Sequence, residues 1–299
     1  MQRLLWIALV GIIFAATPSF AEKHGQTTTL RGYAEILKAL QSGLSVRFAI
    51  DYNKCSPPLG PADAAGGVDT FEWFNLPSFG IEESVAWSQT ELITNYQGSG
   101  YAWDYVRMVA FPNDTLIVTA SDLNTTTYAP IYEETTYCPI NSAAIFSADE
   151  KELPLIQLFD YDSIHTALGK SEVRVFQNYT SCPVYVGPFG KPGLNVTAGS
   201  VITTIENFRG GRFTDEPFFG YSLNQLIKNY DGPGYQRDLV EAKVFRNGSV
   251  ILNVHVFDVL TYQSAFSEYF ECFIDNFTTS GFKFFIPFTP PKAASKTAV

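Results

Sequence analysis

The feature that most constrains this chain is an internal duplication. The stretch ELITNYQGSGYAWD at residues 91–104 recurs as QLIKNYDGPGYQRD at residues 225–238, with eight of fourteen positions identical. The segment that starts at Tyr33 likewise matches the one that starts at Tyr161. A repeat of about 130 residues has the size of a whole domain and is too long for a solenoid unit. We therefore expect two tandem copies of one domain.

The alignment of the two copies also sets the expected boundaries. The segment at 148–152 is charged and is followed by Pro154, which suits a linker because it has nothing to bury and the proline interrupts regular structure. We expect a signal peptide at 1–21, domain one at 30–147, a linker at 148–155, domain two at 156–288 and a flexible tail at 289–299.

Hydrophobic periodicity predicts the same elements in each copy. Tyr33, Ile36, Leu37 and Leu40 have helical spacing, and from Val46 onward apolar residues alternate with a period of two. Short strands with turn-rich connections favour antiparallel hairpins; we expect them at 68–74, 84–88, 105–111, 116–120 and 132–138. The predicted fold class is α+β: two tandem domains, each with an N-terminal helix packed on a curved antiparallel sheet or small barrel.

The four cysteines occupy matched positions in the two copies. Four cysteines allow three connectivities, and the duplication selects the one in which each domain closes its own bridge, Cys55 with Cys138 and Cys182 with Cys272. No CxxC pair or Cys/His cluster has the spacing of metal ligands, so we predict no metal site.

The N-terminus and the sequons indicate the secretory pathway. Arg3 precedes an apolar run of 13 residues that ends near a small-residue cleavage pattern at Ala21, which is typical of a signal peptide and too short to span a bilayer. No later segment is long and apolar enough for a transmembrane span, so we expect a secreted, extracellular glycoprotein. Six Asn-x-Ser/Thr sites are candidates for glycosylation: Asn113, Asn124, Asn178, Asn195, Asn247 and Asn276.

The charge balance and the motifs exclude several functions. Thirty acidic against 20 basic residues make the protein acidic, which is the wrong sign for binding nucleic acid. None of the three histidines has a histidine at the equivalent position of the other copy, and the common hydrolase and nucleotide-binding motifs are absent. We therefore predict no cofactor and no catalytic residue; these observations favour a protein that is not an enzyme, and an enzyme stays open as an alternative.

Polar and aromatic residues shared by the copies are the candidate ligand-binding residues. Tyr hydroxyls and Asp carboxylates could orient a ligand, and an Arg could pair with an anion. The alternative is a Gly-containing loop that enters a strand, with the Asp bonded to nearby backbone and the Arg in solvent. The candidates are Arg47, Tyr96, Tyr101, Asp104, Arg174, Tyr230, Tyr235 and Asp238.

The first copy opens with the segments LKALQSG at 37–43, VR at 46–47 and DYNKC at 51–55, and continues with GVDTF at 67–71 and a strand that reaches Trp87-Ser88. With these segments it resembles the VirK family of exported bacterial proteins. The second copy departs from it, because NYTSC at 178–182 lacks the Asp and the Lys. The resemblance implies a secreted module without an established catalytic mechanism, and it supplies no active-site residues.

Three functions remain open at this point. The first is a non-enzymatic tandem-domain protein that binds an extracellular protein, a glycan or a small apolar ligand. The second is a secreted enzyme or small-molecule carrier with an aromatic cavity, for which a pocket lined by Tyr96, Tyr101, Asp104 and their counterparts would argue. The third is an extracellular or biomineral matrix component, which the acidic balance suggests, although the acids are scattered.

Overall fold

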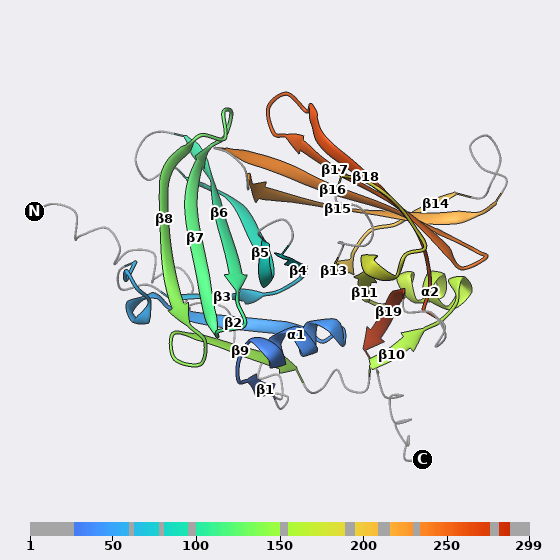
Figure 1. Ribbon diagram of the computed structural model, residues 1–299, viewed down its shortest axis with the longest axis horizontal. Coiled ribbons are helices and arrows are strands. Elements are labelled where there is room, and N and C mark those ends of the chain that lie inside the picture. The colour runs from blue at the N-terminus through green and yellow to red at the C-terminus, as the bar shows by residue number, and fades with distance from the viewer. Residues whose placement is uncertain are drawn as a thin grey trace, which may run out of the picture.

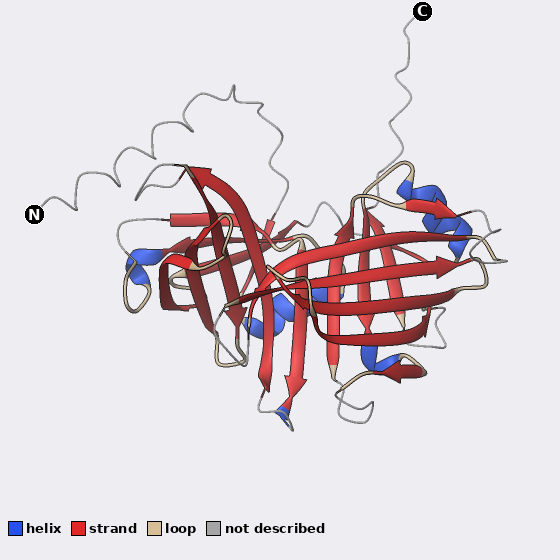
Figure 2. Ribbon diagram, turned by 90° about the horizontal axis from the view of Figure 1, so that it is seen from above, coloured by secondary structure: helices blue, strands red, loops and turns tan. Residues whose placement is uncertain are grey.

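The computed structural model describes residues 27–59, 63–77, 81–94, 100–149, 155–188, 195–208, 216–229, 234–275 and 281–287. The predicted signal peptide and the predicted tail lie outside these ranges. The described part of the chain contains two α-helices and many strands, and Figures 1 and 2 show their arrangement. No helix in this part is long and apolar enough to cross a membrane.

The described part of the first copy contains one α-helix and nine strands. In chain order they are β1 (Thr27–Leu30), α1 (Tyr33–Gln41), β2 (Val46–Asp51), β3 (Asp63–Gly67), β4 (Thr70–Leu76), β5 (Ile81–Thr94), β6 (Tyr101–Ala110), β7 (Thr115–Asn124), β8 (Pro130–Pro139) and β9 (Ala144–Asp149). The predicted strands are therefore present, most of them longer than expected.

In its described residues, the second copy repeats this order with one additional strand, β12. It consists of β10 (Leu155–Leu158), α2 (Tyr161–Leu168), β11 (Val173–Asn178), β12 (Val184–Val186), β13 (Val196–Ile202), β14 (Glu206–Phe208), β15 (Phe218–Lys228), β16 (Tyr235–Phe245), β17 (Ser249–Asp258), β18 (Ser264–Phe273) and β19 (Phe282–Pro287). Strands β9 and β10 include residues 148, 149 and 155 of the predicted linker, and the residues between these strands lie outside the described ranges. The domain boundaries thus remain a prediction.

The strands form three sheets, and one sheet runs through both copies. The four-stranded sheet has the order β1-β9-β2-β3 and the six-stranded sheet the order β12-β18-β17-β16-β15-β14. The nine-stranded sheet has the order β10-β19-β11-β13-β4-β5-β6-β7-β8. Its two halves meet where β13 of the second copy pairs with β4 of the first, from Val196 opposite Phe74 to Ser200 opposite Thr70.

The predicted fold class, α+β, is wrong: this is a mainly β protein. Both predicted helices exist, and each buries one face, as the spacing of Tyr33, Ile36, Ala39 and Leu40 shows for α1. However, the helices are only nine and eight residues long, whereas the strands of three sheets carry almost all of the remaining regular structure. The helix signal in each copy is correct, but it does not indicate how small a share of the fold each helix forms.

The two hydrophobic cores interlock at β4. Because side chains alternate along a strand, Phe71 and Trp73 pack in the core of the first copy, while Phe74 and Leu76 pack in that of the second. In return, Phe285 of β19 and Phe176 of β11, both from the second copy, are buried in the core of the first copy. The copies therefore share apolar surface as well as a sheet.

Gly43 allows one of these close contacts. It follows α1 with φ +78°, a conformation that suits glycine because it has no Cβ. A Cβ at this position would lie 2.8 Å from the Phe285 ring, so a side chain would also push this ring of the second copy away from the first copy.

The predicted disulfide pairing is confirmed in both copies. Cys55 is bonded to Cys138, and Cys182 to Cys272, with sequence separations of 83 and 90 residues. Both bridges are buried. The first ties the segment just after β2 to β8, and the second ties the segment just after β11 to β18. In the chain-entropy model, loops of this length stabilise the folded state by up to about 4–5 kcal/mol each.

Candidate ligand-binding cavity at the junction of the copies

A cavity of about 530 Å³ lies where the two copies meet. This volume is within the range typical of small-molecule sites. The first copy contributes residues of β2 and β4, and the second contributes residues of β13, β15 and β16. The lining includes the side chains of Arg47, Asp69, Phe71, Glu72, Glu172, Tyr179, Ser200, Asn224, Gln225 and Asp238. Most of them are polar, so the cavity is not the aromatic one considered from the sequence.

Two carboxyl groups, one from each copy, face each other in this cavity. Glu72 lies in the middle of the nine-stranded sheet, between Ala198 of β13 and Ala86 of β5. Asp238 lies on β16 opposite Gln225 and is 6% exposed. The seam between the copies therefore brings together two acids that are 166 positions apart in the chain.

Burial and mutual repulsion favour one proton on this pair of acids. Burial raises the pKa of Glu72 well above its usual value, and the charge of Asp238 raises it further. Burial also raises the pKa of Asp238, while hydrogen bonds from Glu72 and Gln225 oppose that rise. Because one negative charge disfavours a second beside it, we assign the proton to Glu72, which donates to the Asp238 carboxylate.

One oxygen of Asp238 is left without a hydrogen-bond partner in the described part of the chain. This oxygen is Oδ1, and it is buried. A buried carboxylate oxygen without a partner costs free energy. A molecule in the cavity that donates a hydrogen bond to Oδ1 would remove this cost.

Tyr179 is held in the cavity wall by a buried hydrogen-bond chain. Its hydroxyl donates to Gln177 Oε1 at 2.6 Å, and Gln177 Nε2 donates to the Tyr221 hydroxyl at 3.1 Å. Burial raises the pKa of Tyr179 well above the usual value, so its hydroxyl is neutral. Tyr179 therefore presents a fixed ring to the cavity.

A smaller cavity of about 250 Å³ adjoins the first and shares Arg47 and Ser200 with it. It is also lined by Arg174, which is buried and already bonded. The Arg174 guanidinium donates to Gly43 O at 3.0 Å and to Glu172 Oε1 at 2.7 Å. Arg174 thus links the two copies, whereas Arg47 is the arginine that faces both cavities.

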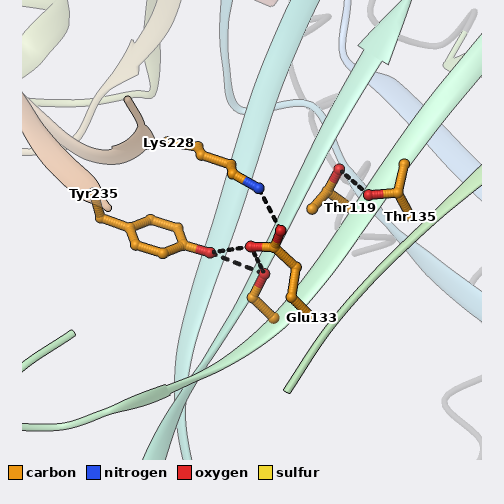
Figure 3. A network of polar contacts seen from close by, with 6 residues as sticks. Thr119, Glu133, Thr135, Lys228 and Tyr235 are labelled. Atoms are coloured by element: carbon orange, nitrogen blue, oxygen red, sulfur yellow. Dashed lines mark hydrogen bonds and ion pairs between the residues drawn. The ribbon is translucent and has the colours of Figure 1, made fainter. Parts of the chain in front are cut away.

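A second set of contacts between the copies lies at the ends of β15 and β16, shown in Figure 3. The Tyr235 hydroxyl lies 2.9 Å from Ser121 Oγ and donates to Glu133 Oε2 at 3.1 Å. Lys228 forms an ion pair with Glu133. Burial raises the pKa of Glu133, but the bonds from Lys228, Tyr235 and Ser121 together outweigh burial and lower it.

Apolar packing supports this second contact. Leu226 and Tyr235 of the second copy are buried in one cluster with Tyr105 and Leu123 of the first copy. The rings of Tyr105 and Tyr235 meet edge to face, with centroids 5.1 Å apart. We call this cluster, with the Glu133 network, the junction contact.

The predicted site residues do not converge on one place. Arg47 and Asp238 line the cavity, Arg174 lines the smaller cavity beside it, and Tyr235 lies in the junction contact. Tyr101 is 65% exposed on the first copy. Tyr96 and Tyr230 lie outside the described residues.

Asp104, the counterpart of Asp238, has a different environment. Burial raises its pKa, and the charges of Asp122 and Glu91 raise it further. Asp122 and Glu91 are its register partners on β7 and β5. Asp104 therefore lies beside acidic residues of its own copy, whereas Asp238 lies beside Glu72 of the other copy.

Most residues of the cavity do not belong to the set predicted from the sequence, and Glu72 and Tyr179 are two of them. Glu72 lies between Phe71 and Trp73, and an acid in an apolar strand is a signal that could have found it. Tyr179 matches Tyr52 of the first copy, but this match alone did not indicate a cavity.

The fold and the cavity define a mainly β protein, built from duplicated antiparallel sheets with one disulfide in each copy and a polar cavity between the copies. Residues 29–128, within the first copy, match the family model of the VirK protein. The protein is therefore VirK-like, as the sequence resemblance predicted.

Among solved structures, one similar chain is a VirK family protein from Legionella pneumophila. It is 16% identical, with a TM-score of 0.34, and the match covers 40% of this chain and 97% of that one. No curated protein matches the chain.

Proposed function

We propose that this VirK-like protein is a secreted, N-glycosylated binding protein, and that its cavity takes up a sugar unit of a glycan. The observation that carries the proposal is the buried, unpartnered Oδ1 atom of Asp238 inside a polar cavity built by both copies. A sugar hydroxyl is a donor of suitable size and charge for that oxygen.

The charges of the lining favour a ligand that is not an anion. Asp69, Glu172 and Asp238 are acidic, and Arg47 is the basic residue that faces them. Carboxylates repel an anionic ligand but accept hydrogen bonds from hydroxyl groups. The amides of Asn224 and Gln225 can both donate and accept, which suits a molecule with several hydroxyl groups.

The lining also offers apolar surface for the ring of a sugar. Phe71 and Tyr179 are buried aromatic residues that line the cavity. Aromatic surface beside a few placed polar groups is the usual composition of a small-molecule site. This combination favours a sugar over both the apolar ligand and the mineral surface considered from the sequence.

Several sequons suit glycosylation of the protein itself. Asn113, Asn124 and Asn247 are exposed. Asn178 and Asn195 are partly buried, and Asn276 lies outside the described residues. We propose that the exposed sites carry glycans in a eukaryotic secretory pathway.

Titration calorimetry on the secreted protein tests the binding proposal. The probes are neutral mono- and disaccharides, with a simple amine such as putrescine as the alternative donor. We expect a sugar to bind, and Asp238→Asn to weaken binding at least about tenfold, because one lost charged hydrogen bond is worth about 1.5–3 kcal/mol. Asp162→Asn, at an exposed position of α2, is the matched control and should bind as the parent does.

Two results would overturn the proposal. Binding of the amine without any sugar would show that the cavity takes up cations. A protein that binds no sugar, or binds one with equal affinity after Asp238→Asn, would show that the cavity is not a sugar site.

A second candidate function, a secreted enzyme, is favoured by the pairing of the Glu72 and Asp238 carboxyl groups in the wall of one cavity. Paired carboxyl groups with separated pKa values are suited to general acid–base catalysis. Turnover of a bound glycoside that is lost in both Glu72→Gln and Asp238→Asn would support an enzyme. Binding without turnover would support the binding protein.

A further inference from the structure

The contact between the two copies is heterologous, which means that each copy uses a different surface. The first copy contributes the edge of β4 and the face that carries Tyr105, Ser121 and Leu123. The second copy contributes the edge of β13 and the ends of β15 and β16. A heterologous contact leaves two surfaces unoccupied. The first copy still has its equivalent of the surface that the second copy uses, and the second copy still has its equivalent of the surface that the first copy uses.

The first copy still carries the surface with which the second copy docks. Leu92 is the equivalent of Leu226, and Tyr101 is the equivalent of Tyr235. Leu226 and Tyr235 are both 4% exposed in the junction contact, whereas Leu92 is 54% and Tyr101 is 65% exposed. Two large apolar side chains that are buried in one copy are thus open to solvent in the other.

The second copy still carries the surface on which docking takes place. Tyr262 is the equivalent of Tyr128, whose hydroxyl accepts a hydrogen bond from Arg237 at 3.2 Å in the internal contact, and Tyr262 is 67% exposed. His255 is the equivalent of Ser121. Both belong to the β17–β18 region, which corresponds to β7–β8 of the first copy.

The strand edges repeat the same relation. Glu72 of β4 pairs with Ala86, and Glu206 of β14 pairs with Gly220, so β14 holds the position of β4 in the second copy. Likewise, β3 pairs with β2 as β13 pairs with β11. Within the described residues, β3 and β14 each end a sheet and have a strand on one side only. Free strand edges are available to pair with another chain.

We propose that this chain associates head to tail with further copies of itself, the first copy of one molecule docking on the second copy of the next. Strand β3 would pair with β14 of the neighbour, and Leu92 and Tyr101 would pack beside its His255 and Tyr262. Repetition of one such step produces a closed ring or an open filament, depending on the rotation per step.

The same step would bring a new pair of acids together. In the internal contact Glu72 of β4 faces Asp238, and their equivalents are Glu206 of β14 and Asp104. Asp104 already lies beside Asp122 and Glu91, and Glu206 is exposed. Each junction between molecules would thus rebuild the acidic part of the cavity, although the association itself does not depend on the proposed sugar ligand.

The contact between molecules should be weaker than the contact within one. Within one molecule Lys228 forms an ion pair with Glu133. The equivalent residues in the contact between molecules are Thr94 and Ser267, so no ion pair can form there. The apolar contribution of Leu92 and Tyr101 remains. We therefore expect an association that depends on protein concentration.

Sedimentation velocity on the secreted full-length protein, over rising concentration, tests this proposal with two blocked variants. The first, Leu92→Asp with Tyr101→Glu, places charge on the docking surface of the first copy. The second, His255→Glu with Tyr262→Glu, places charge on the receiving surface of the second copy. Tyr137→Glu, at an exposed position of β8 outside both surfaces, is the matched control.

We expect the parent and the Tyr137→Glu control to associate, and each blocked variant to stay monomeric. A mixture of equal amounts of the two blocked variants should form a one-to-one dimer and nothing larger, since each supplies the surface that the other lacks. A monomeric parent, association of either blocked variant alone, or a monomeric mixture would overturn the proposal.

A second measurement covers the case in which a blocked variant does not fold. Benzoylphenylalanine at position 101 keeps an aromatic side chain at this exposed site and crosslinks to what it touches under light. We expect intermolecular crosslinks to peptides of β17 or β18. Crosslinks between molecules that map only to the first copy would contradict the head-to-tail contact.

Discussion

The same fourteen-residue stretch lies in two different environments in this molecule. In the second copy, Leu226 and Tyr235 are buried against the first copy, and Asp238 lines the cavity. In the first copy, Leu92 and Tyr101 face solvent. Similar local sequence therefore forms equivalent strand pairs in both copies, while the position in the tandem array determines which residues are buried and which can bind a ligand.

The largest expected effect comes from separating the copies. We expect residues 27–149 and 155–287, expressed as separate chains, to lack fixed tertiary packing, because each loses core side chains that the other supplies, such as Leu76 and Phe285. Near-ultraviolet circular dichroism and amide exchange would measure this, with the joined chain as the control. Two well-packed halves would show that the shared β4 is not needed for either core.

The next effect compares Tyr235 with Tyr101. Tyr235→Ala should lower the free energy of unfolding by about 3–5 kcal/mol, since it empties a buried aromatic site. Tyr101→Ala should change it by less than about 0.5 kcal/mol, which is usual for a surface position. Urea unfolding at low protein concentration would compare them. Equal losses in the two variants would contradict the difference in burial.

The pH dependence of stability should distinguish Glu72 from its equivalent Glu206. The pKa of Glu72 is raised from the usual 4.5 in the folded state, so the folded protein binds more protons than the unfolded chain above that pH. Stability from this group is present at low pH and falls as the pH rises through the raised pKa.

We therefore expect Glu72→Gln to reduce the loss of thermal stability as the pH rises above the usual carboxyl pKa of 4.5. Glu206→Gln, at an exposed position, should leave the pH profile of the melting temperature unchanged. A parent protein whose melting temperature rises with pH above this value, with Glu72→Gln showing the same rise, would argue against the proton assigned to Glu72.

The smallest expected effect concerns the ion pair of the junction contact. Lys228→Thr gives the second copy the residue that the first copy has at Thr94. Both partners are about one-third exposed, so the change should cost about 0–1 kcal/mol in urea unfolding. A loss as large as that of Tyr235→Ala would mean that charge, rather than apolar packing, holds the junction together.

Local features of the structure could be predicted from the sequence. Helical spacing located α1, alternation located β2, and the matched cysteines determined the pairing of both disulfides. The fold class could not be inferred in the same way, because a helix signal says nothing about its weight among many strands. Short strands such as β1 and β9 carry too little periodicity to be recognised.

The cavity was only partly predictable. Arg47 and Asp238 were found because the duplication repeats them, whereas Glu72 belongs to no repeated motif. The reason lies in the pairing of β4 with β13, which joins segments more than 100 residues apart. Nothing in the local pattern of either strand indicates its partner, so the meeting of Glu72 with Asp238 could not be deduced.

The shared strand β4 also has a consequence for the time course of folding. During synthesis β4 is complete about 120 residues before its partner β13. At synthesis rates of about 5–20 residues per second, that interval is on the order of ten seconds. Throughout it, the first copy presents an unpaired strand edge beside apolar side chains that await their partner. Chaperones that protect such edges should therefore matter most for this chain while its second half is still being made.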